Sequence, residues 1–182
     1  MRKLLIVIDM QNDFIDGSLG TKEALAIVEN VKNKIRSWPS EDIIATMDTH
    51  DPDYLSTQEG RNLPVEHCIR GTEGWEIRPD IAELLSDATI YEKPTFGSSK
   101  LAEDMKAISE KEEISLELIG LCTDICVVSN ALLLKAAMPE VEIAVDASCC
   151  AGMTPENHEA ALQTMRSCQI NVHLSNINQH SI

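Results

Sequence analysis

The sequence lacks any long apolar run. Its longest uninterrupted apolar stretch is the five residues 4–8, whereas a membrane-spanning helix needs about 20. The same stretch is too short for the apolar core of a signal peptide. We therefore expect a cytoplasmic protein without a membrane-spanning helix.

Basic residues are also scarce. The 182 residues include 30 acidic and 15 basic ones, for a net charge of −15, and after residue 111 only Lys135 and Arg166 are basic. Such a surface repels the phosphates of nucleic acids and of anionic lipids. We expect neither a nucleic-acid partner nor a membrane surface as partner.

Cys-x-x-Cys pairs, internal repeats, low-complexity tracts and interdomain linkers are all missing. The length is that of about one domain, so residues 1–182 are predicted to form a single domain. Without paired cysteines a zinc ribbon is excluded. The six cysteines are predicted to be free thiols, and four of them to be ordinary buried apolar residues: Cys68, Cys149, Cys150 and Cys168.

Short apolar runs alternate with helical patterns along the chain. The runs predict strands at 3–9, 43–48, 89–92, 116–121, 142–146 and, more weakly, 170–174. Apolar residues recur at helical spacing over 24–35, 101–108, 127–134 and 161–165, and Thr154-Pro155-Glu156 is typical of a helix start. This alternation predicts a three-layer α/β/α fold with a six-stranded, mainly parallel sheet. Residues 49–75 fit neither period and are predicted to form a long functional loop.

Polar residues mark the ends of the predicted strands. Asp9, Asp48 and Asp146 each end one, and Lys93 follows another. Open parallel sheets place their sites beyond the carboxyl ends of the strands. Cys126 follows the fourth strand, in the first turn of a helix, where the helix dipole is expected to stabilise a thiolate. We therefore interpret Cys126 as a nucleophile, with Asp9 and Lys93 as nearby acid and base.

The predicted loop and the strand before it supply a second group of side chains. Asp48, His50, Glu59 and His67 offer two carboxylates and two imidazoles, a ligand set that suits zinc, iron or manganese.

Two segments and one lysine together resemble the isochorismatase-like cysteine hydrolases, and within that family the nicotinamidase/pyrazinamidase branch. They are Ile8-Asp9-Met10-Gln11-Asn12-Asp13-Phe14, Lys93, and Thr123-Asp124-Ile125-Cys126-Val127. The resemblance covers nearly the whole chain. It implies the same six-stranded fold, a catalytic triad of Asp9, Lys93 and Cys126, and a thioester intermediate on the cysteine. Nicotinamide would be hydrolysed to nicotinate and ammonia.

The resemblance also assigns the surroundings of the triad. It implies an oxyanion hole from the backbone N–H groups of Cys122 and Cys126, a cis peptide bond at Leu121–Cys122, and Phe14 in the pocket wall. A divalent ion, zinc first among the candidates, would be held by the four side chains of the loop group. The chain departs from the family pattern in two places. The segment Leu63-Pro64-Val65-Glu66-His67 is one residue longer than the usual form, and its Glu66 is a second candidate, beside Glu59, for the carboxylate ligand. The segment after Lys93 lacks the usual order of Ser and Phe.

Three other functions stay open at this point. Isochorismate hydrolysis is disfavoured because those enzymes generally lack the cysteine. A metal-free N-carbamoyl or ureido amidohydrolase shares the thiol chemistry and would be distinguished by the absence of a bound ion. A non-catalytic binding protein on the same fold would release no ammonia from any amide. For the leading function we expect a small-molecule amide as ligand and a homo-oligomeric assembly.

Overall fold

A computed structural model describes residues 1–175 of the chain. Its centre is one sheet of six strands, in the order β3-β2-β1-β4-β5-β6, with every neighbouring pair parallel. The strands are β1 (Arg2–Ile8), β2 (Ile43–Asp48), β3 (Thr89–Lys93), β4 (Ile114–Leu121), β5 (Glu142–Ala151) and β6 (Asn171–His173). All six predicted strands are present, so the predicted three-layer fold is confirmed.

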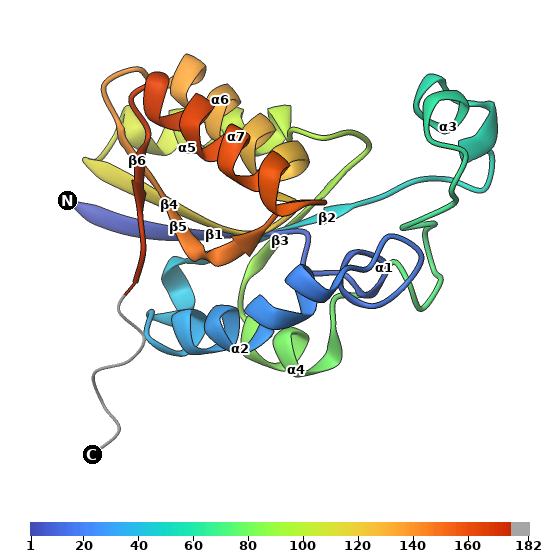
Figure 1. Ribbon diagram of the computed structural model, residues 1–182. Helices are drawn as coiled ribbons and strands as arrows, with labels where there is room; N and C mark the ends of the chain where they lie inside the picture. The colour runs from blue at the N-terminus through green and yellow to red at the C-terminus, as the bar shows by residue number, and fades with distance from the viewer. Residues whose placement is uncertain (176–182) are drawn as a thin grey trace.

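Helices cover both faces of this sheet, as Figure 1 shows. One face carries α5 (Ser99–Ser109), α6 (Val128–Ala137) and α7 (Pro155–Ser167), and the other carries α1 (Asn12–Ile15), α2 (Lys22–Arg36) and α4 (Pro79–Ala82). Each face of the sheet encloses its own apolar core, and β1 contributes alternate residues to both: Leu4, Ile6 and Ile8 to one, Leu5 and Val7 to the other. Nowhere in residues 1–175 is there a helix with the length and apolarity that crossing a bilayer demands.

The segment predicted as a loop at 49–75 contains helical structure. A 3₁₀ turn (Tyr54–Ser56) leads into α3 (Gln58–Asn62), which stands away from both helical layers in Figure 1. Thr57 caps the start of α3: its hydroxyl accepts a hydrogen bond from the Gly60 N–H at 3.0 Å. Five residues are too few for an apolar period to appear in the sequence. The predicted start of α7 is confirmed, because Thr154 caps the helix and Pro155 occupies its first turn.

Two further predictions are wrong. Asp146 does not end β5: a register shift between Leu118 and Gly120 lets the strand continue to Ala151, which leaves Asp146 inside the sheet, bonded to Lys34 Nζ at 3.0 Å. Cys168, predicted to be buried, follows the last turn of α7 and is exposed, because it lies outside the apolar face of that helix. All six cysteines are free, as predicted.

The strand order brings four carboxyl ends to one edge of the sheet. β1 lies between β2 and β4, and β3 flanks β2. Gly120 permits the close approach of β4 to β1: its φ is +116°, and a Cβ there would lie 2.1 Å from the Ile8 carbonyl oxygen. Asp9, Asp48, Lys93 and the turn after β4 are therefore neighbours although they are far apart in the sequence.

Candidate active site

The three residues predicted as a triad meet beyond the carboxyl edge of the sheet. Asp9 directly follows β1 with a φ of +45°, Lys93 is the last residue of β3, and Cys126 lies in a π-helical turn (Thr123–Val127) after β4. The Lys93 ammonium lies 2.7 Å from Asp9 Oδ2 and 3.4 Å from Cys126 Sγ. All three side chains are buried. The fold thus brings together a carboxylate, an ammonium and a thiol shielded from water.

Thr46 orients the Asp9 carboxyl group. The Thr46 hydroxyl donates a hydrogen bond to Asp9 Oδ1 at 2.6 Å, while Asp9 Oδ2 is the oxygen that faces Lys93. Thr46 was not among the residues predicted to belong to the site. The only signal was a hydroxyl within the otherwise apolar run 43–47, and a lone threonine in a strand is common.

Burial dominates the ionisation of these groups. It raises the pKa of the Asp9 carboxyl, against the opposing effect of Lys93. It would lower the pKa of Lys93, but the charges of Asp9, Cys126 and Asp48 outweigh burial and hold that pKa above its ordinary value. The pKa of the Cys126 thiol is well above its ordinary value because of burial, with Asp9 adding to the shift. Burial therefore opposes the thiolate form that the position of Cys126 at a helix start is expected to favour, while the charge of Lys93 supports that form.

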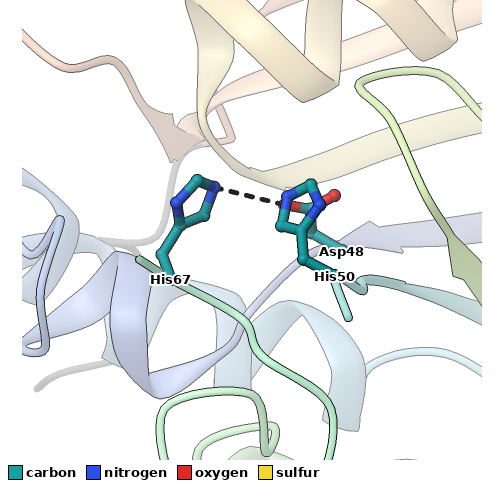
Figure 2. Close-up of side chains that lie close together, drawn as sticks. All are labelled: Asp48, His50 and His67. Atoms are coloured by element: carbon teal, nitrogen blue, oxygen red, sulfur yellow. Dashed lines mark ion pairs between the residues drawn. The ribbon is translucent and has the colours of Figure 1, made fainter. Parts of the chain in front are cut away.

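A second cluster of polar side chains lies beside the triad. In Figure 2 the His67 ring points across to Asp48 and His50. His50 Nε2 lies 3.0 Å from Asp48 Oδ2, and His67 Nε2 lies 3.6 Å from the same oxygen. Glu59 Oε1 is 3.6 Å from His50 Nε2 and 3.8 Å from His67 Nε2. The other oxygen of Asp48, Oδ1, lies 3.3 Å from Lys93 Nζ, so the two clusters share this carboxylate.

The donor atoms of the second cluster fit a divalent ion. Asp48, His50 and His67 each present one ligand atom, all within 4.8 Å of one another. Among residues 1–175, the buried His50 Nε2 forms no hydrogen bond, since the nearby Asp48 Oδ2 lies at 3.0 Å without hydrogen-bond geometry. His67 Nδ1 lies 2.8 Å from the Val65 carbonyl oxygen and donates to it, so in the neutral ring the lone pair of Nε2 faces the cluster. Buried imidazole nitrogens with free lone pairs beside carboxylates are typical of a transition-metal site.

The structure also separates the two rival carboxylates. Glu59 is half-buried and faces both imidazoles, whereas Glu66 is exposed. Glu59 lies outside the tight group of three donors, so it is the most distant of the four predicted ligands.

The backbone of Asp48 is fixed by the buried Gln11, whose amide donates to the Asp48 carbonyl at 2.8 Å and accepts from the Asp48 N–H at 2.7 Å. Gln11 occurs in the quoted motif, but no role was predicted for it.

A cavity of about 170 Å³ joins the two clusters. The Leu121–Cys122 peptide bond is cis, as the resemblance implied, and Cys122 lines the cavity. Phe14 also lines the cavity, as predicted, and its ring centroid lies 5.7 Å from that of His67. Phe96 also lines the cavity, although no role was predicted for it, and it is 43% exposed. The remaining wall is formed by Leu19, Asp48, Glu59, Leu63, His67, Ile125, Cys126 and Met153.

Comparison with known proteins shows the family to which the chain belongs. The Isochorismatase domain model matches residues 3–178, and the chain belongs to the isochorismatase family. The pyrazinamidase of Pyrococcus horikoshii in complex with zinc has a TM-score of 0.80 and 28% identity, over 96% of this chain and 100% of that one. The nicotinamidase/pyrazinamidase of Bacillus subtilis has a TM-score of 0.77 and 30% identity, over 94% and 99%. The nicotinamidase/pyrazinamidase of Mycobacterium tuberculosis is 25% identical over 92% of this chain and 96% of its own.

Proposed function

We propose that this protein is a single-domain, metal-binding cysteine amidohydrolase that converts nicotinamide to nicotinate and ammonia. The observation that carries the proposal is the buried contact of Lys93 with both Asp9 and Cys126, beside a cavity that Cys126 and His67 both line. Relatives named nicotinamidase and pyrazinamidase support the choice of an amide with a nitrogen-containing ring.

In the first half of the reaction Cys126 attacks the amide carbon. Asp9 accepts the thiol proton, and its raised pKa makes it a stronger base than an ordinary aspartate. Lys93 stays charged and stabilises both the Asp9 carboxylate and the developing thiolate. Collapse of the tetrahedral species passes the proton from Asp9 to the amine, releases ammonia and leaves a thioester on Cys126.

In the second half a water molecule hydrolyses the thioester. Asp9 takes a proton from the water as it attacks the thioester carbon, and that proton returns to the sulfur as the acid leaves. In both halves the negative oxygen is held by the backbone N–H groups of Cys122 and Cys126, two residues that line the cavity.

The imidazole cluster serves binding in this proposal. Asp48, His50 and His67 hold the divalent ion, with Glu59 as a more distant partner. When bound, the ion supplies a Lewis-acidic position for the ring nitrogen of the substrate. Phe14 and the apolar wall enclose the ring. Because the thiol is the nucleophile, positioning is what the cluster contributes, and good positioning lowers a barrier by several kcal/mol.

Steady-state kinetics on three amides, together with elemental analysis, test this proposal. Nicotinamide and pyrazinamide carry the ring nitrogen, and benzamide is the matched control that lacks it. We expect stoichiometric metal, turnover of the first two amides, and at least about 10-fold lower kcat/KM for benzamide, because the ion has nothing to hold. Equal turnover of benzamide by metal-free protein would instead favour the N-carbamoyl or ureido amidohydrolase.

A further inference from the structure

One buried side chain outside the cavity connects the nucleophile to the loop that follows Lys93. Asn130 lies on α6, four residues after Cys126, and is 1% exposed. Its Nδ2 donates to the Cys126 carbonyl at 2.8 Å and to the Phe96 carbonyl at 3.1 Å. Its Oδ1 accepts from the Ser98 N–H at 2.9 Å. Both amide protons and the oxygen are therefore engaged, each with a backbone group.

The same loop is attached to Cys126 from its other end. Lys93 Nζ donates to the Thr95 carbonyl at 3.1 Å and lies 3.4 Å from Cys126 Sγ. Backbone groups at 95, 96 and 98 are thus bonded to two buried side chains, Lys93 and Asn130, and each of these also contacts Cys126. Phe96, the half-exposed wall residue, follows the residue that Lys93 bonds, and its own carbonyl is bonded by Asn130.

We propose that Asn130 is a positioning residue, which fixes the Cys126 turn and the Phe96 loop at the spacing that the reaction requires. Asn130 itself does not line the cavity, so it acts through the backbone of its neighbours. Cys126 lies in a π-helical turn, a form that is rare and frequent at functional sites, and the Asn130 amide bonds the Cys126 carbonyl in that turn. The inference rests on the proposed role of Cys126 as nucleophile.

Two variants remove some or all of these bonds and keep a γ-branched side chain with the same number of heavy atoms. Asn130→Leu removes all three, and Asn130→Asp keeps the acceptor for Ser98 but sets a carboxylate oxygen against two carbonyls. The aspartate variant covers the case in which the leucine variant does not fold, and circular dichroism and thermal unfolding report folding. Ser98→Ala is the matched control: it removes the cap bond from the Leu101 N–H to the Ser98 hydroxyl, yet its own backbone N–H still reaches Asn130.

We expect kcat for nicotinamide to fall at least about 10-fold in folded Asn130 variants, since a displacement near 1 Å can cost about 100-fold. KM should rise as well, because Phe96 is released. Iodoacetamide should alkylate Cys126 faster in the variants, as measured by peptide mapping. Cys126 is only 3% exposed in the unaltered protein, and a loop without its bonds to Asn130 admits the reagent to the thiol. Ser98→Ala should stay within about twofold on every readout.

Three results would overturn the inference. The first is a kcat and an alkylation rate of the Asn130 variants within about twofold of those of the unaltered protein. The second is an equal loss of kcat in Ser98→Ala. The third is a parallel fall of kcat and alkylation rate in the Asn130 variants, which would assign Asn130 to ionisation of the thiol. If the unaltered protein hydrolyses no carboxamide, the proposed function fails by itself. The alkylation arm needs no substrate and still decides the role of Asn130.

Discussion

At the scale of single residues, the reaction centre consists of charged groups that are buried and hold one another in place. Lys93 contacts Asp9, Asp48 and Cys126 at once, so one ammonium serves both the triad and the imidazole cluster. Removing one charged side chain leaves the charges of the others buried without an opposite charge, which destabilises the folded protein because the interior has a low dielectric constant. Substitutions here should therefore affect chemistry and stability together, and each test needs a folding control.

Asp9→Asn should lower kcat at least about 100-fold, because the amide cannot accept the thiol proton. The shape of the side chain is kept, so we expect the variant to fold. Steady-state ammonia release measures the effect, with Asp87→Asn, an exposed residue on another loop, as the control. Near-normal turnover by Asp9→Asn would contradict the role of Asp9 as base.

Thr46→Val should move the acidic limb of the kcat/KM profile to higher pH. The Thr46 hydroxyl stabilises the charged form of Asp9 and so lowers the pKa of that carboxyl, although burial raises it more. Without the hydroxyl the pKa of Asp9 rises further, and the base is protonated and lost at a higher pH as the solution is acidified. Thr46→Ser keeps the donor and should retain the original limb. Superimposable profiles for all three proteins would show that Thr46 does not tune Asp9.

Asp9, Lys93 and Cys126 could be predicted because each follows a strand whose apolar run is visible in the sequence. Thr46 and Asn130 could not, because Thr46 acts on Asp9, 37 positions away, and Asn130 bonds backbone groups 34 and 32 positions away. Such contacts depend on strand register and loop path, which short-range patterns do not carry. Roles that came from the family resemblance, such as the oxyanion hole, remain predictions.

At the scale of elements, the contact between β1 and β4 sets the site. Both strands are nearly fully buried, and their carboxyl ends carry Asp9 and the cysteine turn. Strand centres were predicted well because runs buried on both faces are continuously apolar. Ends were predicted less well: β5 runs five residues beyond the predicted Asp146, since its last residues are the small or thiol side chains 147–151 rather than branched ones.

Gly120→Ala should destabilise the protein by about 3 kcal/mol, the combined size of backbone strain and overpacking. Its φ is +116°, and the new methyl group would meet the Ile8 carbonyl at 2.1 Å. Gly71→Ala is a matched comparison, with a φ of +80° and nothing within 4 Å of the new carbon, so only strain of about 1 kcal/mol is expected. Urea unfolding measures both. Equal losses would mean that the close approach of β4 to β1 is unimportant.

At the scale of the whole molecule, two apolar cores hold the sheet rigidly beneath a site built from distant parts of the chain. The side chains of the site come from strands in the first and second halves and from the segment that carries α3. The parallel fold followed from alternation alone, whereas the meeting of residues 48, 50, 59 and 67 depended on how that segment folds back, which had no periodic signal. The expected homo-oligomer stays a prediction.

Zinc should stabilise the folded chain, because an ion that binds only the native state raises stability by about 2.7 kcal/mol at 100 times its Kd. For a chain of this size that corresponds to roughly 5–10 °C in Tm. The shift should be lost in His50→Ala and kept in His173→Ala, which removes a member of the other group of possible ligands, Glu117, Asp146 and His173. Thermal unfolding of chelator-treated protein, with and without zinc, makes the comparison. An equal shift in all three proteins would place the ion elsewhere.

The central claim is that the Cys126 thiol cleaves an amide bond, and ammonia release from nicotinamide by Cys126→Ala protein tests it most directly. The unaltered protein should produce equal amounts of nicotinate and ammonia over many turnovers. Cys126→Ala should fold, bind metal in the same ratio, and produce neither product above the uncatalysed background, because the nucleophile is absent. Multiple turnovers by Cys126→Ala at a rate near that of the unaltered protein would contradict the account.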